Sequence, residues 1–384
     1  MNADLPPLAL YLHMPWCVRK CPYCDFNSHQ LKSAHPDSAY IDALIEDFER
    51  EAPLVAGRRI DSVFFGGGTP SLFAPPEIAR LLQALRERIE FAADAEITLE
   101  ANPGTIERGR FAGYEDAGIN RVSLGAQSFS ARALQRLGRI HTPDDTRRAV
   151  DELRAAGIAN FNLDLMYALP EQTLEEALAD ISAACALGPQ HISHYQLTLE
   201  PGTVFHARPP PLPDEDLAWA MQTQCQRLLA AAGFEQYEVS AYAQPGARCR
   251  HNLNYWLFGD YLGLGAGAHG KLSVELPSRI LRTAKPKQPR EYQDRLRDAQ
   301  DPIGERAWIR SAELPFEFML NALRLNEGFA IRDFESRTGL GAESVAAALE
   351  NAGKRGLIEA VGELWRPTEL GRRFLNDLQS SFLA

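Results

Sequence analysis

The segment CVRKCPYCDF brings three cysteines together near the N-terminus. Cys17, Cys21 and Cys24 follow a C-x3-C-x2-C spacing, so their thiols can converge on one metal centre. Cysteine thiolate is the usual protein ligand of a four-iron, four-sulfur cluster, which takes one ligand per iron. No fourth cysteine lies nearby. One iron would therefore stay open, and an open position distinguishes a reactive metal site from a closed structural one.

Zinc is the main alternative for these thiols. A zinc site needs a fourth cysteine or histidine, which His13 or His29 could supply, although zinc sites usually combine one C-x2-C with a second pair further along the chain. Structural cysteines without a metal are the third possibility, and a disulfide would leave an odd thiol. The local spacing favours iron–sulfur and leaves the other two possibilities open.

The composition is that of an ordinary globular protein. The 384 residues allow a large core in two or three domains, and the hydrophobic and charged fractions are 45% and 24%. A net charge of −11 argues against a nucleic-acid partner. Three clustered and three scattered cysteines do not form a disulfide framework, and neither a signal peptide nor a transmembrane run is recognisable. We therefore expect a cytoplasmic protein.

Strand-like and helix-like segments alternate over the first 235 residues. This order predicts a parallel sheet, and we favour a partial (β/α)6 TIM-like barrel over an open doubly wound sheet. In either fold the site lies at the C-terminal ends of the strands, and curling brings those ends around one mouth. The predicted strands cover residues 8–14, 60–65, 96–100, 121–127, 161–167 and 191–199.

Polar residues collect at these strand ends. Glu100, Gln127, Arg139 and Asp164 together suit a zwitterionic nucleoside, with carboxylates for an ammonium group and ribose hydroxyls and a guanidinium for a carboxylate. Tyr23 could place its ring against a base. The segment GGGTP after the second strand is a weak signal alone, because it lacks the lysine of a phosphate loop. It allows close approach of the backbone to a small charged ligand.

The remainder divides into two predicted parts. Residues 236–308 form a connecting segment that contains HNLNYW, and its stretch 284–310 has the character of a linker or peripheral helix. Residues 309–384 predict a small winged-helix-like α+β module. Glu343 and Glu350 lie on the helix that would read DNA, so the module is expected to be structural or to face a protein partner.

The order of CVRKCPYCDF, GGGTP, ITLEANP, SLGAQSF and NLDLMYALPEQT resembles the radical S-adenosylmethionine (SAM) superfamily. Within it, nearly the whole chain is similar to the branch of oxygen-independent coproporphyrinogen III oxidases and HemW haem chaperones. The resemblance implies a [4Fe–4S] cluster on the three loop cysteines, with SAM chelating the open iron. It implies SAM contacts from Tyr11, Tyr23, Gly67, Gly68, Thr69, Glu100, Gln127, Arg139 and Asp164.

Two features depart from the oxidases. Their loop carries a further cysteine where this chain has Phe26, and only ten residues precede Tyr11 in place of a long N-terminal extension. Decarboxylation of coproporphyrinogen is therefore in doubt, and enzymatic activity is left open. We expect a haem chaperone that passes haem to acceptor haemoproteins, membrane cytochromes among them, with the cluster and SAM governing dimerisation or transfer. An oxidase and a zinc-stabilised regulatory protein are the alternatives.

HNLNYW resembles the HNxxYW signature of the chaperones and implies haem contacts from His251, Tyr255 and Trp256. His251 would be an axial iron ligand beside two flat aromatic surfaces. Judged on its chemistry alone, a single histidine is more simply a residue that caps a turn. Cys249 and His269 are the other possible haem ligands.

Overall fold

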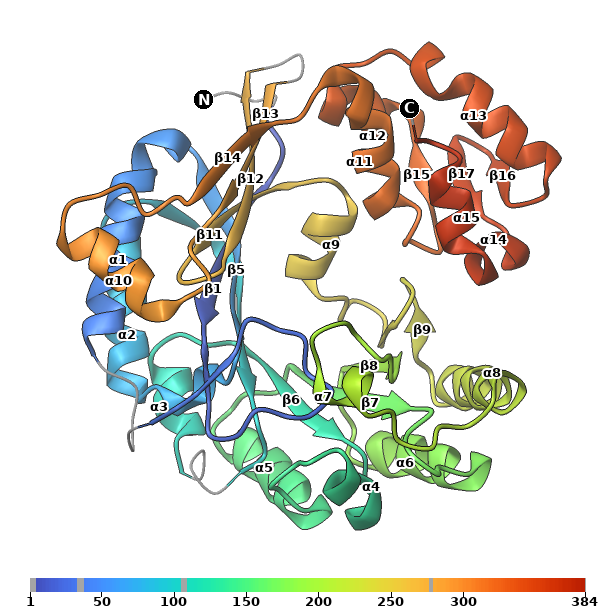
Figure 1. Ribbon diagram of the computed structural model, residues 1–384, viewed down its shortest axis with the longest axis horizontal. Coiled ribbons are helices and arrows are strands. Elements are labelled where there is room, and N and C mark those ends of the chain that lie inside the picture. The colour runs from blue at the N-terminus through green and yellow to red at the C-terminus, as the bar shows by residue number, and fades with distance from the viewer. Residues whose placement is uncertain (1–4, 33–37, 105–108, 276–278, 384) are drawn as a thin grey trace.

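The computed structural model describes residues 5–32, 38–104, 109–275 and 279–383. Its body is a strongly curved twelve-stranded sheet (Figure 1). The strands are β1 (Leu8–Met14), β4 (Arg59–Gly67), β5 (Glu90–Ala101), β6 (Arg121–Gln127), β7 (Phe161–Tyr167), β8 (His191–Gln196), β9 (Glu235–Gln236), β10 (Ala241–Ala243), β11 (Asp260–Leu264), β12 (His269–Glu275), β13 (Arg279–Ala284) and β14 (Glu305–Trp308).

Six neighbouring strands form the predicted parallel half-barrel. The order β1-β4-β5-β6-β7-β8 follows the chain, and every adjacent pair is parallel. The helices between them cover the convex face (Figure 1). These helices are α1 (Ala39–Glu51), α2 (Pro75–Arg86), α3 (Phe111–Asp116), α4 (Ala131–Arg136), α5 (Pro143–Ala155) and α6 (Leu174–Ala186). Two more helices follow β8: α7 (Val204–Ala207), whose Phe205 N–H donates to Pro22 O of the cysteine loop, and α8 (Glu215–Ala231), which packs against α6.

Alternation along β1 separates the core from the interior of the half-barrel. Leu8, Leu10 and Leu12 are buried among the apolar side chains of the covering helices. Tyr11 and His13 point the other way, into the concave side.

Of the two predictions for the stretch 284–310, a linker or a peripheral helix, the structure shows the helix. The stretch contains α10 (Pro289–Arg297), which packs near α1, and then β14, which pairs antiparallel with β13 at the edge of the sheet. All four residues of β14 are exposed, so the strand has no apolar face from which the sequence could reveal it. On the other side of β13, β12 connects to β11, which lies parallel to β1. The helix α9 (Arg250–Trp256) lies on the concave side (Figure 1).

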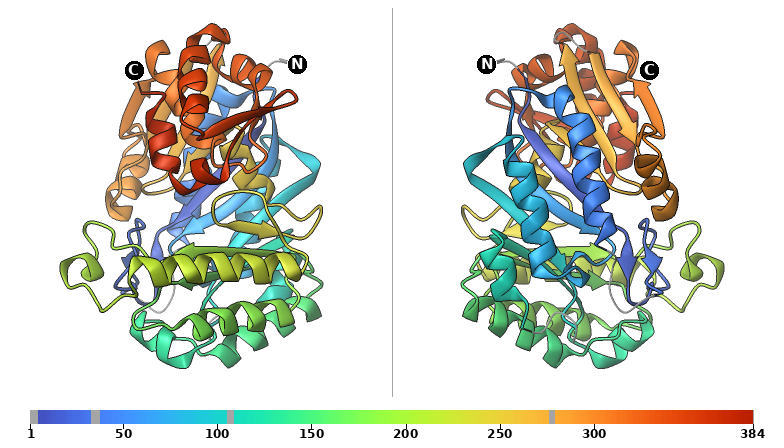
Figure 2. Two further views of the ribbon diagram at one scale, coloured as in Figure 1. Left: turned by 90° about the vertical axis from the view of Figure 1, so that its right-hand side faces the viewer. Right: turned by 90° about the vertical axis from the view of Figure 1, so that its left-hand side faces the viewer.

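The C-terminal module has its own small sheet, in the order β15-β17-β16, and a core built on Phe318 and Phe334. Figure 2 shows the module lying above α8 and α6. Its elements are α11 (Leu314–Ala322), β15 (Phe329–Ala330), α12 (Ile331–Thr338), α13 (Glu343–Lys354), β16 (Ile358–Val361), β17 (Leu364–Pro367), α14 (Glu369–Arg373) and α15 (Leu375–Ser380).

Phe258, between α9 and β11, and Ile280, in β13, pack into the apolar core of the C-terminal module. The division into three domains therefore stays a prediction. Within the described residues, no helix has the length and apolar character needed to cross a bilayer.

Candidate functional site

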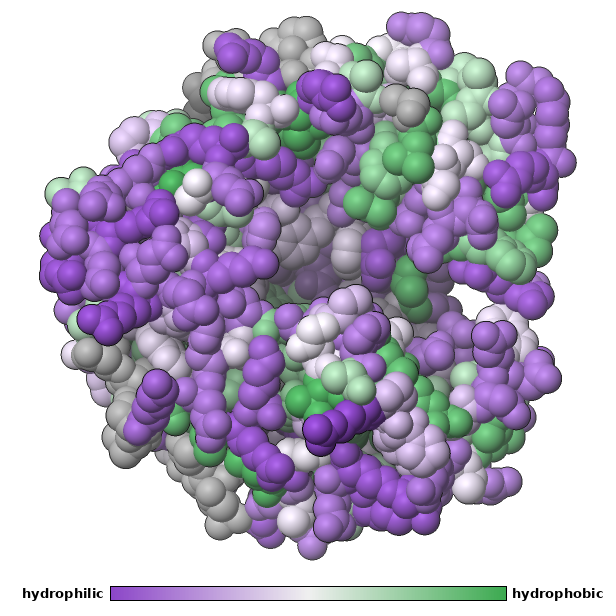
Figure 3. Space-filling model, in the orientation of Figure 1, coloured by the Kyte–Doolittle hydropathy of each residue, from purple (hydrophilic) through white to green (hydrophobic). Residues whose placement is uncertain are grey.

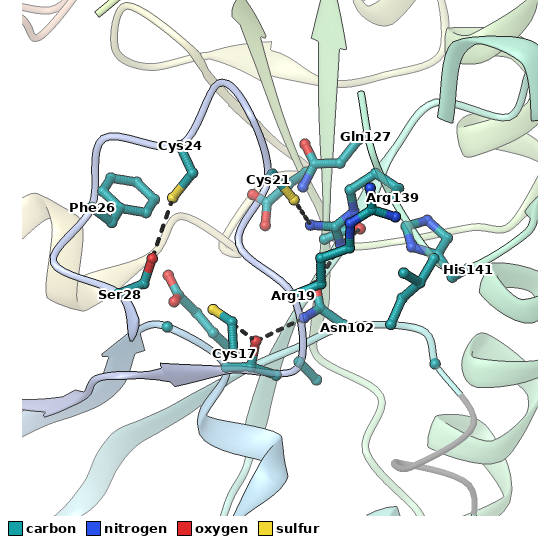
Figure 4. A pocket seen from close by; sticks show the side chains of 18 of the residues that line it. Cys17, Arg19, Cys21, Cys24, Phe26, Ser28, Asn102, Gln127, Arg139 and His141 are labelled. Atoms are coloured by element: carbon teal, nitrogen blue, oxygen red, sulfur yellow. Dashed lines mark hydrogen bonds between the residues drawn. The ribbon is translucent and has the colours of Figure 1, made fainter. Parts of the chain in front are cut away.

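A cavity of about 440 Å³ lies at the C-terminal ends of the parallel strands. Figure 4 shows the side chains of Cys17, Cys21 and Cys24 around it, with Gln127 and Arg139 among the residues across from the cysteine loop. The wall contains every predicted cluster and SAM residue except Tyr11. Its predicted members are Cys17, Cys21, Tyr23, Cys24, Gly67, Gly68, Thr69, Glu100, Gln127, Arg139 and Asp164.

Two short strands, β2 (Trp16–Cys17) and β3 (His29–Gln30), pair and close the base of the cysteine loop. Thr69 Oγ1 donates to Cys17 Sγ at 3.5 Å, and Arg139 Nη1 donates to Cys21 Sγ at 3.7 Å. Ser28 Oγ lies 3.8 Å from Cys24 Sγ. Burial raises the pKa of the Cys17 and Cys24 thiols. Binding of a positively charged metal centre would offset this burial by stabilising the thiolates.

The side chains around the thiols bear on the zinc alternative. In the described parts of the chain, no three or more Cys, His, Asp or Glu side chains are arranged to hold one metal ion. In a four-iron cluster each thiolate binds a different iron, so the three sulfur atoms can lie further apart than around a single ion. Of the two predicted fourth zinc ligands, His13 has both ring nitrogens in hydrogen bonds, to the Tyr11 hydroxyl and to the Asn27 carbonyl oxygen. His29 Nε2 donates to the Lys287 carbonyl oxygen.

The glycines of GGGTP hold the cysteine loop against β4. Gly67 has φ +107°, and a Cβ there would lie 2.5 Å from the His13 ring. A Cβ on Gly68 would lie 2.6 Å from the Trp16 carbonyl oxygen. The Gly68 N–H donates to Met14 O at 2.7 Å and the Thr69 N–H to Trp16 O at 2.8 Å. Only glycine permits this approach of the two segments.

Two carboxyl groups lie deep in the cavity. Glu100 Oε2 accepts from the Gly67 N–H at 3.2 Å, and Asp164 accepts from Ser123 Oγ at 3.1 Å and from Asn162 Nδ2 at 2.8 Å. Burial, with added repulsion from Asp164, raises the pKa of Glu100 to about 8. Burial also raises the pKa of Asp164. A cationic group between these carboxyls would favour their ionised forms.

The positively charged guanidinium of Arg139 lies near the cysteines. Arg139 Nη2 donates to Gly125 O at 2.8 Å and also to Asn102 Oδ1. Gln127 has φ +64° and accepts from Tyr195 Oη at 2.8 Å. A cavity lined by both carboxyls and a guanidinium matches a dipolar ligand. Asn102 and Tyr195 were not predicted, although Asn102 stands in the quoted segment ITLEANP.

Tyr11 lies outside the cavity wall. Its hydroxyl is 3.0 Å from His13 Nδ1, and its ring lies beside Phe64 and His251. Its predicted SAM contact stays a prediction.

The HNLNYW residues occupy α9 and point to separate parts of the fold. His251 is 1% exposed, with Nδ1 bonded to Ser62 Oγ and Nε2 to Tyr255 Oη, each at 3.0 Å. Burial, with the nearby Arg121 charge, lowers its pKa to about 3. Trp256 lies under the Arg324 guanidinium of the module at 4.2 Å. Iron ligation by His251 therefore requires the ring to leave at least one of these bonds.

The other two candidate haem ligands differ in access. Cys249 is fully buried, and its thiol donates to Glu96 Oε1 at 3.5 Å. His269 is exposed at the start of β12.

The chain is similar to known proteins over its two family regions and over its full length. Residues 11–184 match the radical SAM superfamily and residues 309–374 the HemN C-terminal domain. The haem chaperone HemW of Escherichia coli is 49% identical, covering 99% of each chain. HemW of Haemophilus influenzae is also 49% identical, over 99% of this chain and 98% of that protein. The chain shares its fold with coproporphyrinogen III oxidase HemN from Escherichia coli, at a TM-score of 0.84, 24% identity, and coverage of 99% of this chain and 91% of that one.

Full-length identity to two HemW proteins is far higher than the identity to the oxidase. Together with the order of the two family regions, this similarity places the chain in the HemW haem chaperone family of the radical SAM superfamily.

Proposed function

We propose that this protein binds haem and transfers it to acceptor haemoproteins, using a [4Fe–4S] cluster and SAM as resident cofactors. The observation that carries the proposal is the 49% identity to HemW chaperones over the whole chain. The motif HNLNYW supports it, as does the hollow over α9 between the body and the C-terminal module (Figure 3). A flat ligand could reach α9 through this hollow.

The cavity supports the cofactor assignment. Cys17, Cys21 and Cys24 would hold the cluster, which with SAM supplies the one-electron reductive cleavage of SAM when both are bound. Glu100 and Asp164 are placed to receive a cationic group, and Arg139 is placed to receive a carboxylate. Gly67, Gly68 and Thr69 keep the cysteine loop in place, while Gln127 and Tyr23 line the remaining wall.

His251, Tyr255 and Trp256 are proposed as the haem contacts, with His251 as axial ligand. We further propose a cytoplasmic protein without a nucleic-acid partner, whose acceptors include membrane cytochromes and which forms a homodimer during transfer. Phe26 is 60% exposed at the rim of the cavity. Its presence in place of a cysteine is the reason to separate this protein from the oxidases.

The test uses the anaerobically reconstituted protein. Haemin titration followed by mixing with an apo-cytochrome should give tight haem binding and transfer. Coproporphyrinogen III with SAM and a strong reductant should give no protoporphyrinogen, whereas its formation over many turnovers would make the protein an oxidase.

A substitution of His251 tests its assignment as the axial haem ligand. His251→Ala should weaken haemin binding and change the haem absorption spectrum. His194→Ala is the matched control, because His194 is 4% exposed and packs on Tyr167 away from α9. Unchanged affinity and spectrum in His251→Ala would remove His251 from the haem site.

A further inference from the structure

A continuous set of contacts joins α9 to the cysteine loop through the concave side of the sheet. The rings of His251 and Phe64 are stacked with centroids 5.0 Å apart, and Phe64 stacks on Tyr11 at 6.4 Å. Tyr11 is also 6.5 Å from His251. Three aromatic rings on α9, β4 and β1 thus form one cluster, and such offset contacts add to the burial energy of each ring.

Hydrogen bonds extend this cluster to the cysteine loop. The carbonyl oxygen of Asn27 can only accept, so His13 Nε2–H is the donor in their 2.8 Å bond. Burial lowers the pKa of His13, so the ring is neutral and its Nδ1 accepts from the Tyr11 hydroxyl at 3.0 Å. Both bonds therefore have a defined direction, from Tyr11 to His13 to the loop.

Asn27, which follows the last cysteine of the loop, is bonded to the segments that follow β11 and β13. Its Nδ2 donates to Ala266 O and Lys287 O, each at 2.9 Å.

The side chains between α9 and the cysteine loop are too closely packed to move independently. A Cβ on Gly66 would lie 3.0 Å from the Phe64 ring and 3.1 Å from the Tyr11 ring, while Gly67 lies directly against His13. A displacement of Phe64 or Tyr11 is therefore passed on to His13 or to the glycines that support the loop.

We propose that Phe64, Tyr11 and His13 are positioning residues that couple α9 to the cysteine loop, so that binding at α9 and the state of the cluster affect each other. This inference rests on the proposed function for the identity of the two ligands, haem and a [4Fe–4S] cluster. Haem binding through His251 breaks the hydrogen bond of its ring to Ser62 or to Tyr255 and so moves one ring of the aromatic cluster. Loading of the [4Fe–4S] cluster fixes the loop that His13 holds. Coupling between two binding sites is reciprocal.

The first test needs no haem and omits SAM, because Tyr11 is also a predicted SAM contact. The midpoint potential and the electron paramagnetic resonance spectrum of the reconstituted cluster are measured in wild type, His251→Ala, Phe64→Leu and the double variant. His251→Ala should shift both properties, and in the Phe64→Leu background the same substitution should shift neither. Such non-additivity is the physical evidence that a coupling path requires.

His194→Ala is the control for the loss of a buried histidine and should leave the cluster unchanged. Tyr11→Phe keeps the ring and removes the hydroxyl, so it separates the hydrogen bond from the stacking. It should also abolish the response to His251→Ala. Equal shifts with and without the Phe64 ring, or an equal shift in His194→Ala, would overturn the proposal.

The second test compares haemin affinity between cluster-loaded and cluster-free protein. The wild-type affinities should differ by about fivefold or more, the usual lower range for coupled sites, and those of Phe64→Leu should be equal. Equal affinities in the wild type would overturn the coupling although haem binds. Failure of haemin to bind, with the first test positive, would refute the proposed function and leave the coupling standing.

Discussion

At the residue scale, the sequence brought most of its candidate site residues to one cavity because they belong to neighbouring parallel strands and the loops after them. The cysteines, Glu100 and Gln127 stand where a strand meets its loop, and parallel strands bring those positions to one edge, while Asp164 faces the same cavity from the middle of β7. Tyr11 was assigned by motif; it is bonded to His13 and is not among the residues that line the cavity, so its SAM contact stays a prediction. No local pattern distinguishes a side chain that faces a ligand from one that supports a neighbouring loop.

Gly67 offers a test of how the loop is supported. Gly67→Ala places a Cβ against the His13 ring at a φ that disfavours alanine, so the loop must shift and the reconstituted protein should hold markedly less iron and sulfide. Gly202→Ala is the matched control, since Gly202 also has positive φ, +85°, but no atom within 4 Å of its Cβ position. Equal iron content in the two variants would show that strain alone, and not the approach to His13, matters.

Glu100 should make the stability of the cofactor-free protein depend on pH. Its pKa is about 8 in the fold and ordinarily near 4.5, so between these values the folded state binds more protons and stability falls as pH rises. Glu100→Gln removes this loss. The variant should gain about 1–3 kcal/mol over wild type at pH 8 and little at pH 4.5, measured by chemical denaturation. A gain that does not vary with pH would contradict the assignment.

At the element scale, periodicity revealed strands with an apolar face and missed one without it. β1, β6 and β7 match their predicted bounds because their residues are almost all buried. The exposed β14 gave no such signal. The position of α9 was also not predictable, since it depends on contacts with Ser62 and Glu96, far away in the sequence.

The joint between the body and the C-terminal module depends on Arg324. Its Nη2 donates to Glu238 Oε2 at 3.1 Å, and its guanidinium covers Trp256. Glu238 is 2% exposed, so Arg324→Ala leaves a buried carboxylate without its cation and should lower the free energy of unfolding by about 2–3 kcal/mol. Arg332→Ala breaks an exposed pair with Glu363 and should cost less than about 1 kcal/mol. Similar losses in both variants would show that the buried ion pair stabilises the fold no more than the exposed one.

At the scale of the whole molecule, the first helix is tied to a segment more than 230 residues later. Lys285, which directly follows β13, forms ion pairs with Asp47 and Glu51 of α1, and all three side chains are almost fully buried. Tyr292 Oη donates to Asp47 Oδ2 at 2.8 Å, which adds α10 to the same cluster. The pairing could not be predicted because α1, β13 and α10 have no common sequence pattern.

Lys285→Met tests this connection and its dependence on pH. The variant leaves two buried carboxyls without a cation, so it should lose about 3–5 kcal/mol of unfolding free energy at pH 8. Burial already raises the pKa of Asp47 against the pull of Lys285. Without the lysine, protons bind the folded state still more readily, and the deficit should shrink as pH falls toward 5. Urea denaturation at both pH values measures it. The triple variant with Asp47→Asn and Glu51→Gln should lose the pH dependence, whereas a deficit constant with pH would assign the loss to packing.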